Sequence, residues 1–231
     1  MDTQAITFDV GGTLIEPWPS VGHIYAEVAA RHGHKNLSSE NLNRQFAAAW
    51  QTKRNFDHSR AAWRRLVDQT FAGLTEHPLR EAMFDDLYRR FSEASAWRVF
   101  DDVRPALDHL KARRLGLGII SNWDERLRPL LRQLQLDHYF TVTVISIEAG
   151  FTKPQEQIFR RAAEEFGLPP HSLLHVGDSP AEDGEGARAA GMRGLLLDRK
   201  ARAGTALAIT TLTELLRPFE ESGATARQDK D

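Results

Sequence analysis

The sequence contains no cysteine, so neither disulfides nor thiolate chemistry can contribute to its structure or activity. It also lacks any apolar run that approaches the ~20 residues needed to span a bilayer as a helix. Neither sign of charge dominates, because 30 Lys and Arg residues stand against 32 Asp and Glu residues and the net charge is −2. We therefore expect no dedicated nucleic-acid binding and no membrane attachment.

The N-terminus has no basic region followed by an apolar stretch, so we expect no signal peptide and take a cytoplasmic location as the default. With 231 residues, 41% of them hydrophobic, the chain can form one large domain or two small ones. There is no nucleotide P-loop and no internal repeat, and the nine histidines have no spacing that completes a metal site. The sequence leaves open whether the protein is a monomer or a homodimer.

The chain is organised around a short strand that ends on a carboxylate. Residues 6–8 are strand-forming, Asp9 follows them, and Gly11 and Gly12 allow a sharp turn and a close approach of the backbone to a ligand. Open parallel sheets bind their ligands at the carboxyl ends of their strands. Asp9 is therefore the first candidate for a functional residue.

Between residues 17 and 97 the apolar residues recur at helical spacing only. Four amphipathic stripes begin near Val21, Leu42, Trp63 and Leu79, and Ser20 is placed to cap the first of them. Four helices of this size can share one apolar core as a small bundle. This segment is predicted to be a separate helical domain.

After residue 98 predicted strands alternate with helices. Strands are expected at 117–120, 142–145, 173–176 and 195–197, and helices at 103–114, 124–135, from after Pro154 to about 166, 181–190 and 211–218. Such alternation indicates a parallel sheet with right-handed crossovers. The predicted fold class is therefore α/β, a Rossmann-like parallel-sheet core (1–16 and 98–220) with an inserted all-helical cap (17–97). Residues 221–231 are expected to be a disordered tail.

Carboxylates at two strand ends suggest metal-assisted phosphoryl transfer. A carboxylate that attacks a phosphate ester forms an acyl phosphate, and the two anions need a cation between them. Mg²⁺ is the natural cofactor because it prefers carboxylate, carbonyl and phosphate oxygens. Asp178 and Asp183 follow the strand at 173–176. Asp9, the carbonyl of Gly11, Asp178 and, through water, Asp183 would hold the ion.

The transferred phosphoryl group also needs hydrogen-bond donors on its remaining oxygens. Ser121 ends the predicted strand at 117–120, and Asn122 follows it with an amide group. Lys153 would supply a positive charge just before a helix. The backbone N–H groups that follow Gly11, those of Gly12 and Thr13, could bind the phosphate as well.

Taken together, these motifs resemble the haloacid dehalogenase-like hydrolase superfamily. Its first motif is Asp-x-Asp-Gly-Thr, its second a Ser or Thr at a strand end, its third a Lys, and its fourth an acidic pair. The matching positions here are Asp9 to Thr13, Ser121, Lys153, and Asp178 with Asp183. The resemblance covers about residues 4–218. It implies a Mg²⁺-dependent phosphatase that acts on a small phosphorylated metabolite through an aspartyl-phosphate at Asp9, with Ser121 and Lys153 as further catalytic residues.

One position departs from the pattern of the superfamily's phosphatases. The second aspartate, which acts there as general acid and base, is Gly11 here. General acid–base catalysis contributes ~10²–10⁴ in rate, so simple phosphate esters should react slowly. A good leaving group or a cap residue such as Glu16 or His23 could compensate.

Three other functions are compatible with the loss of the second aspartate. A dehalogenase needs no acid, although dehalogenases of the superfamily lack the acidic fourth motif that is present here. A phosphonate hydrolase would use a cap lysine, of which the candidates are Lys35 and Lys53. A protein that binds phosphate without catalysis is the third alternative.

Overall fold

The computed structural model describes residues 3–53, 56–75, 79–201 and 208–216. By packing, the chain divides into two units. We call the first the core unit (Met1–Leu14, Val99–Asn122, Leu136–Asp231) and the second the helical unit (Ile15–Arg98, Trp123–Gln135). The expected tail, 221–231, lies outside the described residues. Within the described ranges, no helix is both long and apolar enough to cross a membrane.

The core unit contains a six-stranded parallel sheet with the strand order β5-β4-β1-β6-β7-β8. The strands are β1 (Ala5–Phe8), β4 (Gly116–Ser121), β5 (Val142–Ile145), β6 (Leu173–Gly177), β7 (Arg193–Leu197) and β8 (Ala208–Ile209). The first strand in the sequence is central in the sheet, between β4 and β6, and all four of its residues are buried. This arrangement confirms the predicted α/β class.

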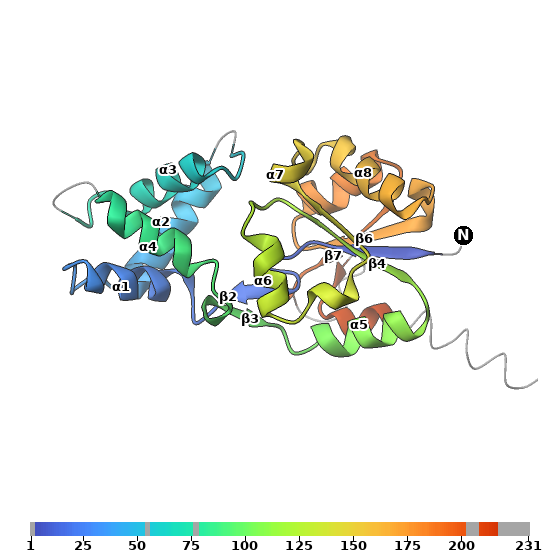
Figure 1. Ribbon diagram of the computed structural model, residues 1–231, viewed down its shortest axis with the longest axis horizontal. Coiled ribbons are helices and arrows are strands. Elements are labelled where there is room, and N and C mark those ends of the chain that lie inside the picture. The colour runs from blue at the N-terminus through green and yellow to red at the C-terminus, as the bar shows by residue number, and fades with distance from the viewer. Residues whose placement is uncertain (1–2, 54–55, 76–78, 202–207, 217–231) are drawn as a thin grey trace, which may run out of the picture. The chain divides into compact units, whose positions relative to one another are not determined.

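Helices cover both faces of the sheet, with α8 over one face and α5 over the other (Figure 1). The helical segments of the unit are α5 (Val103–Ala112), α7 (Ser146–Ala149), α8 (Glu156–Phe166), α9 (Gly186–Ala189), a π-helix η4 (Pro180–Glu185) and a 3₁₀-helix η5 (Leu212–Leu216). The predicted helix at 181–190 is thus a π-helix followed by one α-helical turn, and the described part of that at 211–218 contains a 3₁₀-helix over Leu212–Leu216.

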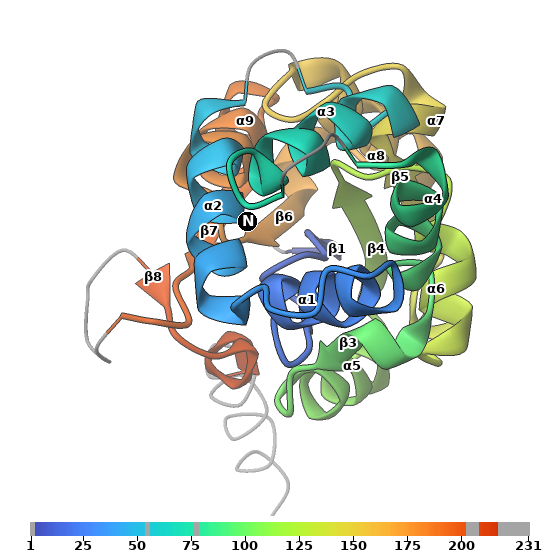
Figure 2. The ribbon, with the colours of Figure 1, turned by 90° about the vertical axis from the view of Figure 1, so that its left-hand side faces the viewer.

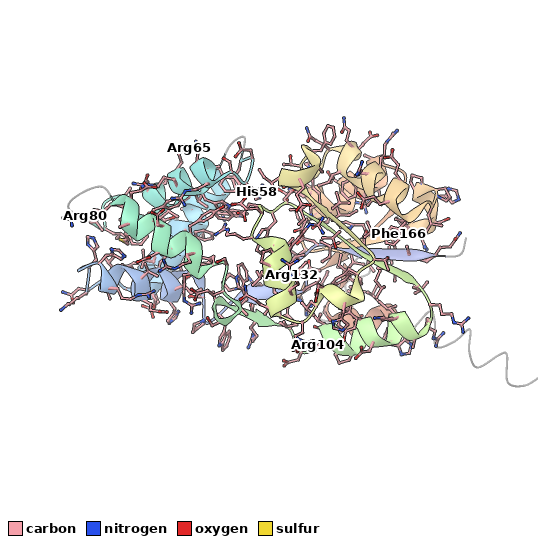
Figure 3. The ribbon with its side chains drawn as sticks, viewed as in Figure 1. His58, Arg65, Arg80, Arg104, Arg132 and Phe166 are labelled. Atoms are coloured by element: carbon pink, nitrogen blue, oxygen red, sulfur yellow. The ribbon has the colours of Figure 1, made fainter. Side chains whose placement is uncertain are left out.

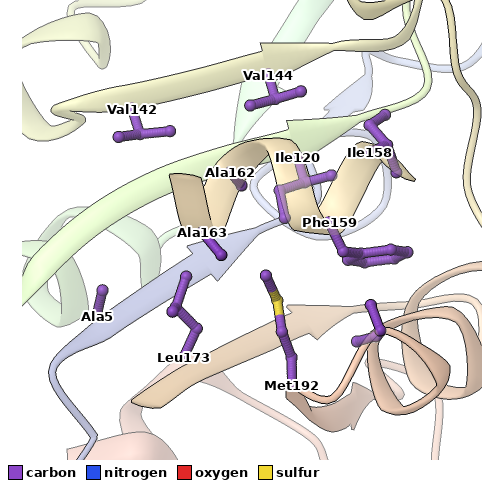
Figure 4. Close-up of a cluster of buried hydrophobic side chains, with 12 residues drawn as sticks. Ala5, Ile120, Val142, Val144, Ile158, Phe159, Ala162, Ala163, Leu173 and Met192 are labelled. Carbon is purple, nitrogen blue, oxygen red and sulfur yellow. The ribbon is translucent and has the colours of Figure 1, made fainter. Parts of the chain in front are cut away.

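The apolar face of α8 forms the main core contact. Ile158, Phe159, Ala162 and Ala163 recur at helical spacing and pack on residues of β1, β4, β5 and β6 (Figure 4). At the end of α8, the Phe166 ring lies so close to Gly116 and Gly118 that a Cβ at either glycine would come within 2.9 Å of it. Phe166 is labelled in Figure 3.

The helical unit is a bundle of α1 (Val21–Arg31), α2 (Ser39–Thr52), α3 (Arg60–Phe71) and α4 (Glu81–Arg90). Around the bundle the helices follow the order α3, α2, α1, α4 (Figure 2). Their shared cluster includes Tyr25, Leu42, Phe71 and Phe84, and the Tyr25 and Phe71 rings stack with centroids 5.5 Å apart. Ser20 caps α1 as expected, since its hydroxyl accepts a hydrogen bond from the His23 N–H.

Two short strands, β2 (Ile15–Pro17) and β3 (Trp97–Val99), pair where the chain passes from one unit to the other. The packing division differs from the expected domain boundaries chiefly at Trp123–Gln135, which contains α6 (Leu127–Gln133) and groups with the helical unit. Contacts of Arg126 contribute to this grouping. Its guanidinium pairs with the buried Asp124, lies 3.5 Å from the ring centroid of Tyr88, and donates to the Tyr88 carbonyl.

Candidate active site

The candidate site lies at the carboxyl ends of three adjacent parallel strands of the core unit. Asp9 follows β1, Ser121 is the last residue of β4, and Asp178 follows β6. Phe8 of β1 pairs in register with Ile119 on one side and Val176 on the other. The strands therefore end together, and their following residues meet at one edge of the sheet.

A buried lysine joins two carboxylates at this edge. The Lys153 ammonium donates to Asp9 Oδ1 and to Asp183 Oδ1, each at 2.6 Å. The Ser121 hydroxyl also donates to Asp9 Oδ1, at 3.0 Å. Lys153 is 3% exposed, Asp183 1% and Asp9 8%, so these charges interact with little screening by water. The structure thus brings together four of the predicted site residues.

Burial and charge determine how readily each group ionises. Burial raises the pKa of Asp9 above its ordinary value of 3.8, although Lys153 opposes this shift. Burial would also raise the pKa of Asp183, but the charge of Lys153 and the hydrogen bond from His175 outweigh burial and hold it below 3.8. For Lys153, burial favours the neutral amine, yet the two carboxylates raise its pKa above 10.5. The site therefore combines a charged lysine with an ionised Asp183.

Asp178 completes a group of three carboxylates that fits a divalent cation. One oxygen each from Asp9, Asp178 and Asp183 lie within 4.8 Å of one another, and Asp178 is exposed. Partial desolvation of its carboxyl group, together with the negative charges of Asp9 and Asp183, raises the pKa of Asp178 to about 7. Three oxygen donors with unfavourable mutual repulsion match the ligand preference of Mg²⁺.

Two glycines let the backbone approach these carboxylates. Gly12 has a positive φ of 79°, and a Cβ there would lie 2.3 Å from Asp178 Oδ2. A Cβ at Gly177 would lie 2.2 Å from the Asp183 carboxyl group. Side chains at either position would therefore displace a candidate metal ligand.

The π-helix η4 places Asp183 at the base of the site. Ser179 precedes η4, and its N–H donates to Asp183 Oδ2 at 2.9 Å. The Ser179 hydroxyl accepts from the Glu182 N–H at 3.2 Å and so begins the helical segment. The wider π turn has Asp183 buried and Glu182 only partly buried.

The buried His175 ring contacts the carboxyl group of Asp183. The ring is fully buried, with Nε2 3.1 Å from Asp183 Oδ1 and Nδ1 2.9 Å from the Thr7 hydroxyl. Burial lowers the pKa of His175 below 6.5, which favours the neutral ring at neutral pH, and we assign the ring hydrogen to Nε2 because the carboxylate of Asp183 can only accept. His175 is thus an interior, hydrogen-bonded residue. Sequence reasoning missed its partner Thr7, although both are polar residues in otherwise apolar strands and face each other in register.

The Asn122 side chain forms two hydrogen bonds with the backbone of Lys153. Its Oδ1 accepts from the Lys153 N–H at 2.7 Å, and its Nδ2 donates to the Lys153 carbonyl at 3.0 Å and to Glu182 Oε2 at 3.1 Å. The sequence suggested that this side-chain amide would bind phosphate. In the structure it connects the loops after β4, β5 and β6, and the expected phosphate contact stays a prediction.

We expect Asn122→Ala to lower kcat by about 10–100-fold, because supporting residues of this kind typically contribute that much. The reason is that Lys153 would lose both side-chain hydrogen bonds to its backbone. Steady-state kinetics on para-nitrophenyl phosphate, with circular dichroism to check folding, measures the effect. Asn122→Asp is the matched variant and should be at least as impaired, because a second carboxylate would face Glu182. Native kcat in both variants would contradict the assignment.

Thr13 lies in the turn rather than in the exposed part of the site. It is fully buried, its N–H donates to the Val10 carbonyl at 3.3 Å, and its own carbonyl accepts from Arg199 at 2.7 Å. The phosphate contact expected from its N–H therefore stays a prediction, as do the contact expected from Gly12 and the metal bond from the Gly11 carbonyl.

Four other candidates lie in the helical unit, namely Glu16, His23, Lys35 and Lys53. Glu16 forms an ion pair with Arg98. The Lys53 ammonium lies 3.7 Å from the ring centroid of Trp50. Their proposed roles as substitute acid or cap lysine stay predictions.

Comparison with known proteins extends this picture to the whole chain. A family model described as haloacid dehalogenase-like hydrolase matches residues 3–191. The zebrafish (Danio rerio) haloacid dehalogenase-like hydrolase domain-containing protein 3 is 32% identical, in an alignment that spans 98% of this chain and 97% of that protein. The agreement therefore extends well beyond the motifs.

Solved structures agree with the fold. A HAD phosphatase from Thermococcus onnurineus superposes with a TM-score of 0.67 and 25% identity, covering 95% of this chain and 98% of its own. YfnB from Bacillus subtilis, solved bound to magnesium, gives a TM-score of 0.78 over 95% of this chain and 100% of its own. At 16% identity, this second likeness concerns the fold alone.

Proposed function

The chain belongs to the haloacid dehalogenase-like hydrolase family, and from this premise we propose that it is a Mg²⁺-dependent phosphatase that acts on a small phosphorylated molecule through Asp9. The observation that carries the proposal is the buried Asp9–Lys153–Asp183 group with the exposed Asp178 beside it. A nucleophile, a fixed positive charge and a set of oxygen ligands lie together at the carboxyl edge of the sheet.

In the first step, Asp9 attacks the phosphorus atom. Lys153 and Ser121 both donate to Oδ1 of Asp9, so we assign Oδ2 as the attacking oxygen. These two hydrogen bonds fix the orientation of the carboxylate, and a fixed geometry lowers the entropic cost of the attack. The bond between Oδ2 and phosphorus forms, and the bond to the leaving oxygen breaks. Water then hydrolyses the aspartyl-phosphate and regenerates Asp9.

Asp9, Asp178, the Gly11 carbonyl and, through water, Asp183 would hold the Mg²⁺. When bound, the ion neutralises repulsion between the carboxylates and the phosphate. Asp183 suits contact through water, because Oδ1 already accepts from Lys153 and His175 and Oδ2 from the Ser179 N–H. Asp178 is the exposed member and suits direct coordination.

Lys153 serves both carboxylates at once. Its charge keeps Asp183 ionised and partly offsets the burial of Asp9. The ammonium group has three N–H donors, and two of them bind Asp9 and Asp183. The third can therefore point toward a phosphoryl oxygen. The acidic group beside Asp9 also favours phosphatase chemistry over the dehalogenase alternative, since halide release calls for no cation site.

Trapping with beryllium fluoride tests the proposal. Beryllium fluoride mimics a phosphoryl group on a carboxylate, so ¹⁹F NMR of the native chain with Mg²⁺ should show a bound signal that disappears in Asp9→Asn and after chelation of Mg²⁺. Asp101→Asn, an exposed site on the same unit, is the matched control and should keep the signal. If the signal survived in Asp9→Asn, the covalent mechanism through Asp9 would be wrong.

A further inference from the structure

The residue two positions after Asp9 has no side chain, and the turn does not demand this. Positive φ falls on Gly12, at 79°, whereas Gly11 is not among the glycines with positive φ. A Cβ at Gly12 would meet Asp178, so that glycine is required by the packing. The backbone at Gly11 lies outside the left-handed region that favours glycine. Backbone strain therefore does not account for the missing side chain at Gly11.

In the proposed mechanism none of the proton-bearing groups around Asp9 faces the leaving oxygen, since the third N–H of Lys153 points toward an oxygen of the transferred phosphoryl group. Lys153 donates to both Asp9 and Asp183, and the His175 ring is held between Thr7 and Asp183. Lys153 and His175 are buried and fixed by these hydrogen bonds. Asp178 is exposed, and we assign it to the metal. Within the described part of the core unit, this cluster thus offers no side chain in position to protonate a leaving oxygen.

We propose, on the basis of the proposed function, that the substrates are phosphoryl donors whose leaving group departs as a stable anion, as in acyl phosphates and phosphoanhydrides. When the bond from phosphorus to the leaving oxygen breaks, the electron pair stays on that oxygen. A carboxylate leaving group has a conjugate-acid pKa of about 4 and a phosphate of about 6, so neither needs a proton at neutral pH. An alkoxide, with a basicity near that of hydroxide, does need one.

The second step balances without a side-chain base. Water attacks the phosphorus of the aspartyl-phosphate, and the bond to Asp9 Oδ2 breaks. Both protons of the water leave on the released dihydrogen phosphate, and Asp9 returns as a carboxylate. Because Gly11 provides no base for the water, this step is slow, and the aspartyl-phosphate accumulates with a good leaving group. A pre-steady-state burst of leaving group, equal to the concentration of Asp9 sites, is expected.

The decisive experiment measures kcat/KM, with saturating Mg²⁺, for acetyl phosphate, para-nitrophenyl phosphate, phenyl phosphate and methyl phosphate. These leaving groups are small and span a wide range of basicity. For the native chain, kcat/KM should fall steeply as the leaving group becomes more basic. Gly11→Asp should raise kcat/KM for methyl phosphate by about 10²–10⁴ and for acetyl phosphate by less than about threefold. Gly11→Asn, of the same size but without an acid, should raise neither. Pyrophosphate, run in parallel, tells a phosphoanhydride substrate from an acyl phosphate.

The outcomes separate this inference from the proposed function. Methyl phosphate hydrolysed by the native chain as readily as acetyl phosphate would overturn the inference, because another group would then supply the proton, while the phosphatase proposal would stand. An equal gain in Gly11→Asn and Gly11→Asp would also overturn it, since bulk rather than acidity would be responsible. If acetyl phosphate were not hydrolysed and beryllium fluoride did not bind at Asp9, both would fall together. The native series needs no variant, so a variant that fails to fold leaves the inference testable.

Discussion

Asp9→Asn should lower Mg²⁺-dependent turnover of para-nitrophenyl phosphate to below about 10⁻⁴ of the native rate, the scale of loss seen when a covalent nucleophile is removed. The amide oxygen of asparagine carries no full negative charge, so it is a poor nucleophile. The aspartyl-phosphate that water hydrolyses in the second step therefore does not form. The substitution changes almost no volume, so the loss reports chemistry rather than packing. Steady-state assays with and without Mg²⁺ measure it.

The control for this prediction is Asp101→Asn, which removes the same charge from an exposed position of the core unit. Its kcat and KM should match those of the native chain. Circular dichroism and a thermal melt of Asp9→Asn should show an intact fold. Residual activity of Asp9→Asn above one hundredth of the native rate would mean that water or another side chain attacks the substrate directly.

The sequence predicts the part of this site that lies where parallel strands end. Asp9, Ser121 and Asp178 are recognisable as polar residues that directly follow or end apolar segments. The carboxyl ends of neighbouring parallel strands must meet at one edge of the sheet. Lys153 is predicted as the positive charge that a transferred phosphoryl group needs, whereas its position between two carboxylates comes from the structure. For Asp9, Ser121 and Asp178, the apolar pattern of the strands and the rule on the carboxyl ends of parallel strands are sufficient.

Other contacts depend on register and on loop geometry, which the local pattern does not contain. The hydrogen bonds between the Asn122 side chain and the Lys153 backbone depend on where the loop that carries Lys153 is placed. The contact between Thr7 and His175 requires the register of β1 against β6. The π-helix at 180–185 differs from the expected α-helix in its hydrogen-bond spacing, which an acidic, glycine-containing stretch does not reveal.

The short elements were missed for a different physical reason. The strands β2 and β3 have three residues each, too few to display a period of two. The grouping of Trp123–Gln135 with the helical unit depends on side-chain contacts, such as that of Arg126 with Tyr88 and that of Gln133 with Ser92. Hydrophobic periodicity does not predict which residues such side chains contact.

Lys153→Met should destabilise the metal-free protein by about 3–5 kcal/mol at pH 8, which is the usual cost of removing one partner from a buried ion pair. Two carboxylates that are 8% and 1% exposed would lose their shared cation. Turnover should fall by a factor on the order of 10³, because the charge that orients Asp9 is gone. Urea unfolding in the presence of a chelator measures the stability, and Lys200→Met, at an exposed position, is the matched control.

The pH dependence distinguishes this electrostatic role from simple packing. In the native chain, the pKa of Asp183 lies below 3.8, so its stabilising contribution is present above about pH 4 and is lost as the pH falls further. Lys153 has a pKa raised above 10.5, so its contribution is fully present at both pH 5 and pH 8.

Without the lysine, burial and repulsion by Asp183 should raise the pKa of Asp9 further above 3.8, and Asp183 should lose the largest of the effects that lower its pKa, so the folded state should bind more protons than it does in the native chain. The stability deficit of Lys153→Met relative to the native chain should therefore be larger at pH 8 than at pH 5. A deficit that is the same at both pH values would mean that Lys153 stabilises the core unit through the packing of its aliphatic chain, and the charge balance proposed for Asp9 would then need another source.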